Sequence, residues 1–436
     1  MKKFIVPLLT AVMVVSIIFA GCMPAAPAPP VTPPVTPPVT PPPVTPPPVT
    51  PEVLTVKIGF NAPLSGPAAA WGLPGLEGTS IWVDKVNAAG GIEAGGKRYL
   101  VEIVEFDNEG IGSKALLGAR KLVLEDGVVA ILMLGGAPSA TVQPFLTEQE
   151  IMTFVLIASD IAPDRPYLLD VTDNFPTYHL LHIDYIAEAH PEMKTAAIVS
   201  QDDEIGLASI AWSEAGFEAE GIEVVYSSPF GIETIDFAPT MTAVLATDPD
   251  IISMGAAYPE FQALICEQAY IQGWEGIITS ACWDFAAIIA KVPVEFMEDA
   301  VSGFPDFDDP QLTPAHHEFW TEWRARYPGS TFSEIVWEYK AALEVWAYGV
   351  GLADSIESKA VYEALKAADT VPHSFGPGVW WGTEIWGMDN LLVPTWPITE
   401  IHNGKPVTVA WKNLVDWLEE GNNREILNQT LERWGM

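Results

Sequence analysis

The stretch that decides the fold is residues 54–91, LTVKIGFNAPLSGPAAAWGLPGLEGTSIWVDKVNAAGG. Apolar and polar residues alternate over residues 54–60, a pattern that predicts a β-strand. A loop rich in glycine and proline follows, and residues 75–87 then show the spacing of an amphipathic helix. The pair Gly90-Gly91 ends that helix, because glycine is favoured just past a helix C-terminus. The stretch is therefore a strand–loop–helix unit.

The same alternation continues through two further parts of the chain. Predicted strands and helices alternate up to residue 157, and a second series begins after Asp170 and runs to residue 280. Two runs of strand–helix units predict an α/β protein with two doubly wound parallel sheets. The C-terminal third differs, with three predicted helices over residues 314–368 and a hairpin marked by the turn signal Asn403-Gly404.

Composition excludes several classes of function. The 436 residues include 57 acidic and 21 basic side chains, which gives a net charge of −36. Nucleic-acid binding needs a basic surface, so nucleic acid is excluded as a partner. The same charge disfavours a peripheral protein held by anionic lipids. The length favours more than one domain.

The N-terminus is predicted to be an export signal. Lys2 and Lys3 precede an apolar run over residues 4–20, which is typical of a secretory signal peptide covering residues 1–21. The following Cys22 resembles the lipidated cysteine of a bacterial lipobox; a plain signal peptide or a short membrane anchor are the alternatives. Residues 22–52 are rich in Pro, Val and Thr and, from residue 24 to 51, carry no charge. They are predicted to form an extended polyproline II stalk.

Several segments of the body resemble one protein family. Residues 58–72, 86–92, 119–122, 135–139, 236–237 and 255–260 are similar, in order and spacing, to the leucine/isoleucine/valine-binding proteins, the solute receptors of amino-acid-type ABC importers. The resemblance implies a type I periplasmic-binding fold, in which two lobes joined by three crossover segments enclose a ligand. It places lobe 1 at residues 53–172 and 304–392, and lobe 2 at residues 173–303 and 393–436.

The resemblance also implies ligand-binding residues on lobe 1. Trp71 stands where the family has an aromatic residue that covers the ligand, although it could instead pack on its own lobe. Ser139, Ala158 and Ser159 follow strands whose loops contact a ligand carboxylate in the family. Helix capping is the alternative role for Ser139.

On lobe 2 the resemblance is less complete. Asp203 and Tyr258 lie in loops that face the ligand, but Ile205 and Ala257 replace aromatic residues of the family. The acidic residue that pairs with an ammonium group aligns near Cys282, so the neighbouring Trp283 and Asp284 become candidates for the site.

These departures bear on the type of ligand. A buried ammonium without a counter-charge is costly, so a small carboxylate or amide with an apolar or aromatic body is favoured over a branched-chain amino acid. Which solute binds, and whether an ammonium is recognised, stays open.

The expected function is that of a lipid-anchored solute-binding protein on the outer face of the cytoplasmic membrane. Its expected partners are a small-molecule ligand and an ABC transporter permease, and it is expected to be a monomer that touches the membrane only through lipid. The alternative is an extracellular ligand-sensing module with the same fold. Such a sensor is normally followed by a membrane helix, whereas this sequence stops at Met436, which favours transport.

No catalytic residues, metal site or cofactor are expected. The pair His179 and His182 has metal-compatible spacing on a helix, but no third ligand stands nearby in sequence, so both are expected at the surface. The pair His316-His317 is likewise expected to be exposed. Cys266 and Cys282 could form a disulfide in an exported protein, and the sequence leaves this open.

Overall fold

The computed structural model describes residues 53–66, 68–158, 161–305, 309–330 and 334–436. These described residues belong to one compact unit. Cys22 and the rest of the predicted signal and stalk, together with Ser159, lie outside the described residues. Among the helices described, none is both long and apolar enough to cross a bilayer.

A six-stranded sheet organises the first part of the chain, with the order β2-β3-β1-β4-β5-β6. All neighbouring strands are parallel except β2, which runs antiparallel to β3. The strands are β1 (Val53–Ala62), β2 (Ile92–Ala94), β3 (Lys97–Asp107), β4 (Ala130–Leu134), β5 (Met152–Leu156) and β6 (Leu168–Leu169). The helices between them are α1 (Ala69–Ala88), α2 (Gly112–Lys121), which continues as a π-turn over Leu122–Asp126, and α3 (Ala137–Glu148).

A seven-stranded sheet organises the second part, with the order β15-β14-β11-β10-β9-β7-β8. Its strands are β7 (Thr195–Ile198), β8 (Glu223–Ser227), β9 (Ile251–Ser253), β10 (Ile277–Ser280), β11 (Val301–Ser302), β14 (Thr395–His402) and β15 (Lys405–Asn413). The accompanying helices are α4 (Phe175–Ala189), α5 (Glu204–Ala219), α6 (Ala238–Leu245), α7 (Pro259–Ile271) and α8 (Phe285–Ile289), the 3-10 turn Val294–Met297, α13 (Leu414–Glu419) and α14 (Asn423–Trp434). The first five strands are parallel, whereas β14 and β15 add an antiparallel hairpin at one edge.

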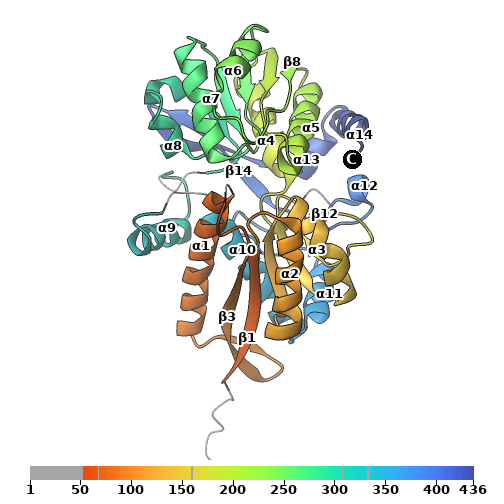
Figure 1. The fold of residues 1–436 in the computed structure, drawn as a ribbon. Coiled ribbons are helices and arrows are strands. Elements are labelled where there is room, and N and C mark those ends of the chain that lie inside the picture. Colours follow the sequence, from red (N-terminus) through yellow and green to blue (C-terminus); the bar gives the residue numbers. More distant parts are fainter. Residues whose placement is uncertain (1–52, 67, 159–160, 306–308, 331–333) are drawn as a thin grey trace, which may run out of the picture. The chain divides into compact units, whose positions relative to one another are not determined.

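Segments far apart in sequence complete the first part. The long helix α10 (Ile335–Ala353) lies beside α1, where Gly75 and Gly78 of α1 leave no room for a side chain against Tyr339 and Val336 (Figure 1). The other elements are α9 (Pro314–Arg326), α11 (Ser358–Ala367), β12 (Val379–Trp381), α12 (Thr383–Trp386) and β13 (Leu391–Val393). Strand β13 is joined to the end of β6 by a bridge between Leu391 and Asp170.

The chain therefore passes between the two sheets three times. It leaves the first sheet after β6, returns after β11, and leaves again between β13 and β14. An aromatic cluster packs at two of these crossings. Phe304 and Trp396 lie 6.1 Å apart between ring centroids, and Phe375 lies 5.1 Å from Trp396. We call the elements around the first sheet lobe 1 and those around the second sheet lobe 2.

The expectation that His179, His182 and His316 are exposed was wrong. His179 and His182 are fully buried rather than exposed, because α4 is covered on several sides by other parts of lobe 2. The Nδ1 atom of His182 lies 2.7 Å from Thr279 Oγ1, and burial lowers the pKa of His182 to about 3 and that of His179 to about 4. His316 is also buried and stacks on Phe375 with a ring separation of 5.4 Å.

Two further expectations are settled by the structure. Trp71 does not lie in an extended loop, since α1 already begins at Ala69. Cys266 and Cys282 do not form a disulfide; both are free, buried thiols.

Candidate functional site

A cavity of about 280 Å³ opens between the two lobes at the carboxyl ends of their parallel strands. Lobe 1 contributes residues that follow β1, β3 and β4, and lobe 2 contributes the start of α5 and the residue before α7. The lining residues are Pro63, Ala68, Gly110, Leu134, Gly135, Gly136, Ala137, Pro138, Asp203, Glu204, Ile205 and Tyr258. Ligands of open α/β sheets bind at this end of the strands, where loops run into helix N-termini.

An aromatic contact joins the lobes beside this cavity. The ring of Trp71, in the first turn of α1, meets the ring of Tyr258 edge-on, with centroids 4.7 Å apart. Trp71 is only 1% exposed, and its Nε1 has no hydrogen-bond partner within the described part of the chain. The Tyr258 hydroxyl donates a hydrogen bond of 2.7 Å to Asp203, whose other carboxylate oxygen accepts from the Gly206 amide and caps α5. Asp203 therefore fixes both the helix start and the aromatic wall.

The N-terminus of α3 forms the lobe 1 side of the cavity. Gly136 precedes the helix with φ of 79° and ψ of −158°, a conformation that favours glycine. A side chain at Gly135 would meet the Ile157 carbonyl at 2.2 Å, so the two glycines let the helix begin at the cavity wall. Helix N-termini present free amides and positive potential, which suits a carboxylate.

An acidic side chain of lobe 2 approaches this helix N-terminus. A Cβ atom built on Gly136 would lie 3.7 Å from the Glu204 Oε2 atom. The cavity thus combines a positive helix end on lobe 1 with the carboxylates of Asp203 and Glu204 on lobe 2.

Buried acids lie close to one another where α10 meets lobe 2. The Tyr178 hydroxyl faces Glu334 Oε1 at 3.5 Å, and burial, together with the charge of Asp284, raises the pKa of Glu334 to about 7. Burial also raises the pKa of the Cys282 thiol, and the adjacent Glu334 raises it further. Asp284 caps α8 by accepting from the Ala287 amide at 2.9 Å. Its other oxygen is buried without a partner among the described residues, and burial raises its pKa.

A second carboxyl pair lies next to this group. Burial raises the pKa of Asp173 to about 7, and burial together with the charge of Asp173 raises the pKa of Glu338 well above its ordinary range. Neither carboxylate oxygen of Glu338 has a hydrogen-bond partner among the described residues, so burial disfavours the charged form of this acid.

The structure brings together only some of the residues predicted for the site. Asp203 and Tyr258 line the cavity, and Trp71 packs on Tyr258. Ser139 is fully buried in the first turn of α3, behind Ala137 and Pro138, and does not serve as the helix cap.

The other predicted residues lie apart from the cavity lining. Ala158 is buried, and its amide donates at 2.9 Å to Asp170. Trp283 and Asp284 are buried beside Cys282 and do not line the cavity.

Sequence reasoning missed Glu204 and the acids of α10. Glu204 is the first residue of α5, next to a helix-capping aspartate, and could have been noticed on that basis. The signal for the others was the pair Glu334 and Glu338, spaced four residues apart next to the apolar face of a predicted helix. Acids at that spacing share one helix face, so their closeness to each other could have been anticipated, although their burial could not.

Comparison with known proteins agrees with this geometry. A family model described as periplasmic binding protein matches residues 55–405. A Leu/Ile/Val-binding protein of Rhizobium johnstonii is 24% identical over 337 residues, which cover 74% of this chain and 86% of that protein. A Leu/Ile/Val-binding protein homolog of Brucella abortus is 24% identical over 342 residues, with coverage of 72% and 77%.

Solved structures show the same fold at lower identity. The substrate-binding protein LivJ of Streptococcus pneumoniae, in complex with isoleucine, superposes with a TM-score of 0.65 at 20% identity, covering 82% of this chain and 99% of LivJ. A solute-binding protein of Rhodopseudomonas palustris, in complex with 4-hydroxybenzoate, gives a TM-score of 0.62 at 17% identity, covering 82% and 96%. With its type I fold and its cavity between two lobes, this chain belongs to the leucine/isoleucine/valine-binding family of periplasmic binding proteins.

Proposed function

We propose that this protein is the lipid-anchored receptor of an ABC importer, which captures a small organic solute between its lobes and delivers it to a permease. Cys22 carries the lipid, residues 22–52 form the stalk, and the body works as a monomer on the outer face of the cytoplasmic membrane. The family supplies the general role of solute binding for transport. The anchoring, the solute and the permease are our proposal.

The observation that carries the proposal is the cavity lined by both lobes, with Trp71 and Tyr258 in contact beside it. A solute held there touches both lobes and stabilises their closed arrangement, which is the signal that a permease can recognise. The volume of 280 Å³ is at the small end of ligand pockets, which suits a solute of amino-acid size.

The chemistry of the cavity supports a carboxylate or an amide as the ligand. The polar end of the ligand faces the N-terminus of α3, near Gly136 and the buried Ser139. The apolar body of the ligand lies against Ile205 and Tyr258, which line the cavity, and Tyr258 is in turn in contact with Trp71. Two structural neighbours were crystallised with isoleucine and with 4-hydroxybenzoate, and both of those molecules carry a carboxylate.

A free ammonium has weaker support within the cavity. Asp203 already accepts hydrogen bonds from Tyr258 and Gly206, and Asp284 does not line the cavity. Glu204 approaches the N-terminus of α3, where we place the carboxylate of the ligand, so its charge opposes that group. We therefore favour small carboxylates and amides with an apolar or aromatic body over branched-chain amino acids.

The lobes are proposed to hinge where the chain crosses between the sheets. This places lobe 1 at residues 53–172 and 304–392, and lobe 2 at residues 173–303 and 393–436. The crossings after β6, after β11 and between β13 and β14 absorb the change in backbone dihedral angles during closure.

A thermal-shift screen of the full chain tests the proposal. Amino acids, short acids, amides, aromatic carboxylates, amines and sugars are compared, since a ligand at 100 times its Kd adds about 2.7 kcal/mol to the free energy of unfolding. We expect at least one carboxylate or amide to raise the melting temperature. A screen in which only cationic or sugar ligands stabilise the protein would contradict the proposed ligand class.

A further inference from the structure

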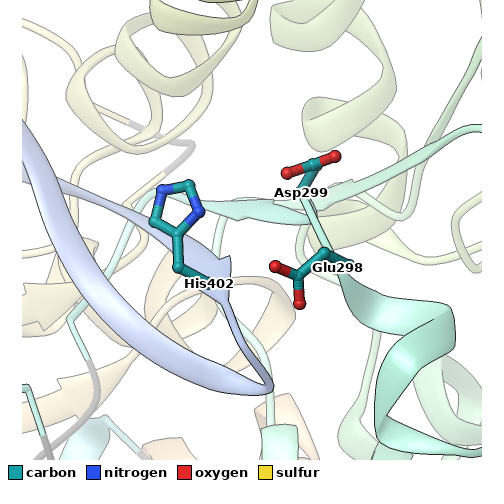
Figure 2. Close-up of side chains that lie close together, drawn as sticks. All are labelled: Glu298, Asp299 and His402. Carbon is teal, nitrogen blue, oxygen red and sulfur yellow. The ribbon is translucent and has the colours of Figure 1, made fainter.

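A group of three metal-ligating side chains lies in lobe 2, outside the cavity. Glu298 and Asp299 precede β11, and His402 ends β14 at the tip of the β14–β15 hairpin. One ligand atom from each of the three side chains lies within 4.8 Å of the other two (Figure 2). Glu298 and Asp299 are exposed and His402 is half-buried, so ions can reach all three from solvent.

The ring of His402 is oriented by a buried carboxylate. Its Nε2 lies 2.8 Å from an oxygen of Glu400, a residue that is only 3% exposed and that accepts hydrogen bonds from the Tyr185 hydroxyl at 2.9 Å and from His190 at 2.6 Å. Because Nε2 is engaged, Nδ1 is the nitrogen that faces Asp299 and Glu298 (Figure 2). A carboxylate on the far nitrogen is the usual second-shell arrangement of a metal-binding histidine.

The two acids are held by backbone hydrogen bonds. The oxygens of Glu298 accept from the amides of Asn403 and Gly404, at 2.8 and 3.2 Å. The amide of Asp299 donates to the Ile401 carbonyl at 3.0 Å, and Asp299 has a left-handed φ of 62°. The hairpin tip therefore fixes both acids relative to His402 before any ion binds.

Hydrogen-bond acceptors of His402, Glu298 and Asp299 face one another in this group. If Nε2 of His402 donates to Glu400, then Nδ1 presents a lone pair to two carboxylates, and a cation between them resolves the repulsion. Lys405 is paired with His402 across the hairpin and is exposed. The ammonium group of Lys405 is the cation that would compete with a metal ion for these three side chains.

We propose that Glu298, Asp299 and His402 bind a divalent transition-metal ion of the Zn²⁺ type. One imidazole and two carboxylates, with water completing the shell, are ligands that suit Zn²⁺ better than Mg²⁺ or Ca²⁺. A bound ion ties the hairpin tip to the segment before β11 and so braces an edge of the second sheet. The sequence predicted no metal site because only neighbours in sequence were considered. Of the three ligands proposed here, His402 is distant in sequence from Glu298 and Asp299, and they come together only in the fold.

Calorimetric titration of the chelator-treated full chain with Zn²⁺ tests this site. We expect one ion per chain, and a loss of affinity of at least about tenfold in both His402→Ala and Asp299→Asn. His317→Ala is the matched control, because His317 lies on α9, outside the site, and this variant is expected to bind as the wild type does. Co²⁺ absorption gives a second readout, with visible bands that weaken in the two site variants.

Two results would overturn the proposal. One is the absence of measurable Zn²⁺ binding to the wild-type chain, in which case a proton or Lys405 satisfies the cluster. The other is equal Zn²⁺ affinity in wild type, His402→Ala and Asp299→Asn, which would place the ion elsewhere. Circular dichroism of each variant checks that it is folded. If His402→Ala does not fold, Asp299→Asn still tests the site.

Discussion

Trp71 of lobe 1 and Tyr258 of lobe 2 meet edge-on, with ring centroids 4.7 Å apart and an angle of 71° between their planes. Edge-to-face pairs of this kind contribute about 0.5–1.5 kcal/mol beyond the area that they bury. The contact joins residues 187 positions apart in sequence and lies beside the cavity. It therefore joins the two lobes beside the cavity where we propose that the solute binds.

Removing the indole ring should weaken binding of whichever solute the screen identifies. In Trp71→Ala we expect a loss of affinity of about tenfold, because Tyr258, which lines the cavity, loses the ring that it packs against. Trp411→Ala is the control, since Trp411 is 45% exposed on β15 and away from the cavity. Calorimetry that gives wild-type affinity in Trp71→Ala would remove this residue from the site.

Glu204 offers a test of the ligand's charge. Its carboxylate approaches the N-terminus of α3, where we place the carboxylate of the ligand. Glu204→Gln removes a like charge, and we expect a rise in affinity for carboxylate ligands of about threefold or more. Glu214→Gln on the same helix is the control. Weaker binding in Glu204→Gln would show instead that the acid pairs with a cationic group of the ligand.

The buried Glu334 should leave a signature in the pH dependence of stability. Its pKa is raised from 4.5 to about 7 in the folded state, mainly by burial, so the folded protein holds this proton more tightly than the unfolded chain. The free energy of unfolding then falls as pH rises from about 4.5 to about 7, and levels off above that.

Glu334→Gln should flatten this fall by up to about 1 kcal/mol per pH unit, because glutamine does not titrate. Urea unfolding between pH 4.5 and 8 measures the effect, and the exposed Glu432→Gln serves as the control. A slope that is identical in Glu334→Gln and the wild type would assign the proton to another group of the cluster, such as Asp173 or Glu338.

The sequence predicted the alternation of strands and helices because each unit carries its own local signals. The strand in residues 54–60, the glycine pair at 90–91 and the turn at Asn403-Gly404 depend on neighbours in sequence, and all three occur in the structure. Trp71, Asp203 and Tyr258 were predicted through resemblance to a family, and the fold brings them into contact with each other or with the cavity.

What could not be predicted depends on contacts between distant segments. The burial of His179 and His182 follows from α4 being enclosed within lobe 2, and the acids of α10 are buried because that helix meets Tyr178 and Cys282. Polar residues at such positions look like surface residues in the sequence. Their environment is set by packing, which local patterns do not encode.

The proposed lipid anchor can be tested independently of the cavity. Cys22→Ser prevents lipid attachment, so the protein should move from the membrane fraction to the soluble fraction on cell fractionation. Mass spectrometry of the wild-type protein should find the lipid on an N-terminal Cys22. If Cys22→Ser stays in the membrane fraction, the apolar run over residues 4–20 is a membrane anchor and the lipobox interpretation is wrong.

The central claim, a solute bound in the cavity between the lobes, is tested most directly by filling that cavity. Ile205 lines it from lobe 2 and is 5% exposed, so the larger side chain in Ile205→Trp occupies space that the ligand needs. Ile271→Trp makes the same change at a residue that is 64% exposed on α7. Calorimetry with the best ligand of the screen should show a loss of at least about 100-fold in Ile205→Trp and no change in Ile271→Trp. Equal affinity in both variants would place the ligand outside this cavity and contradict the account.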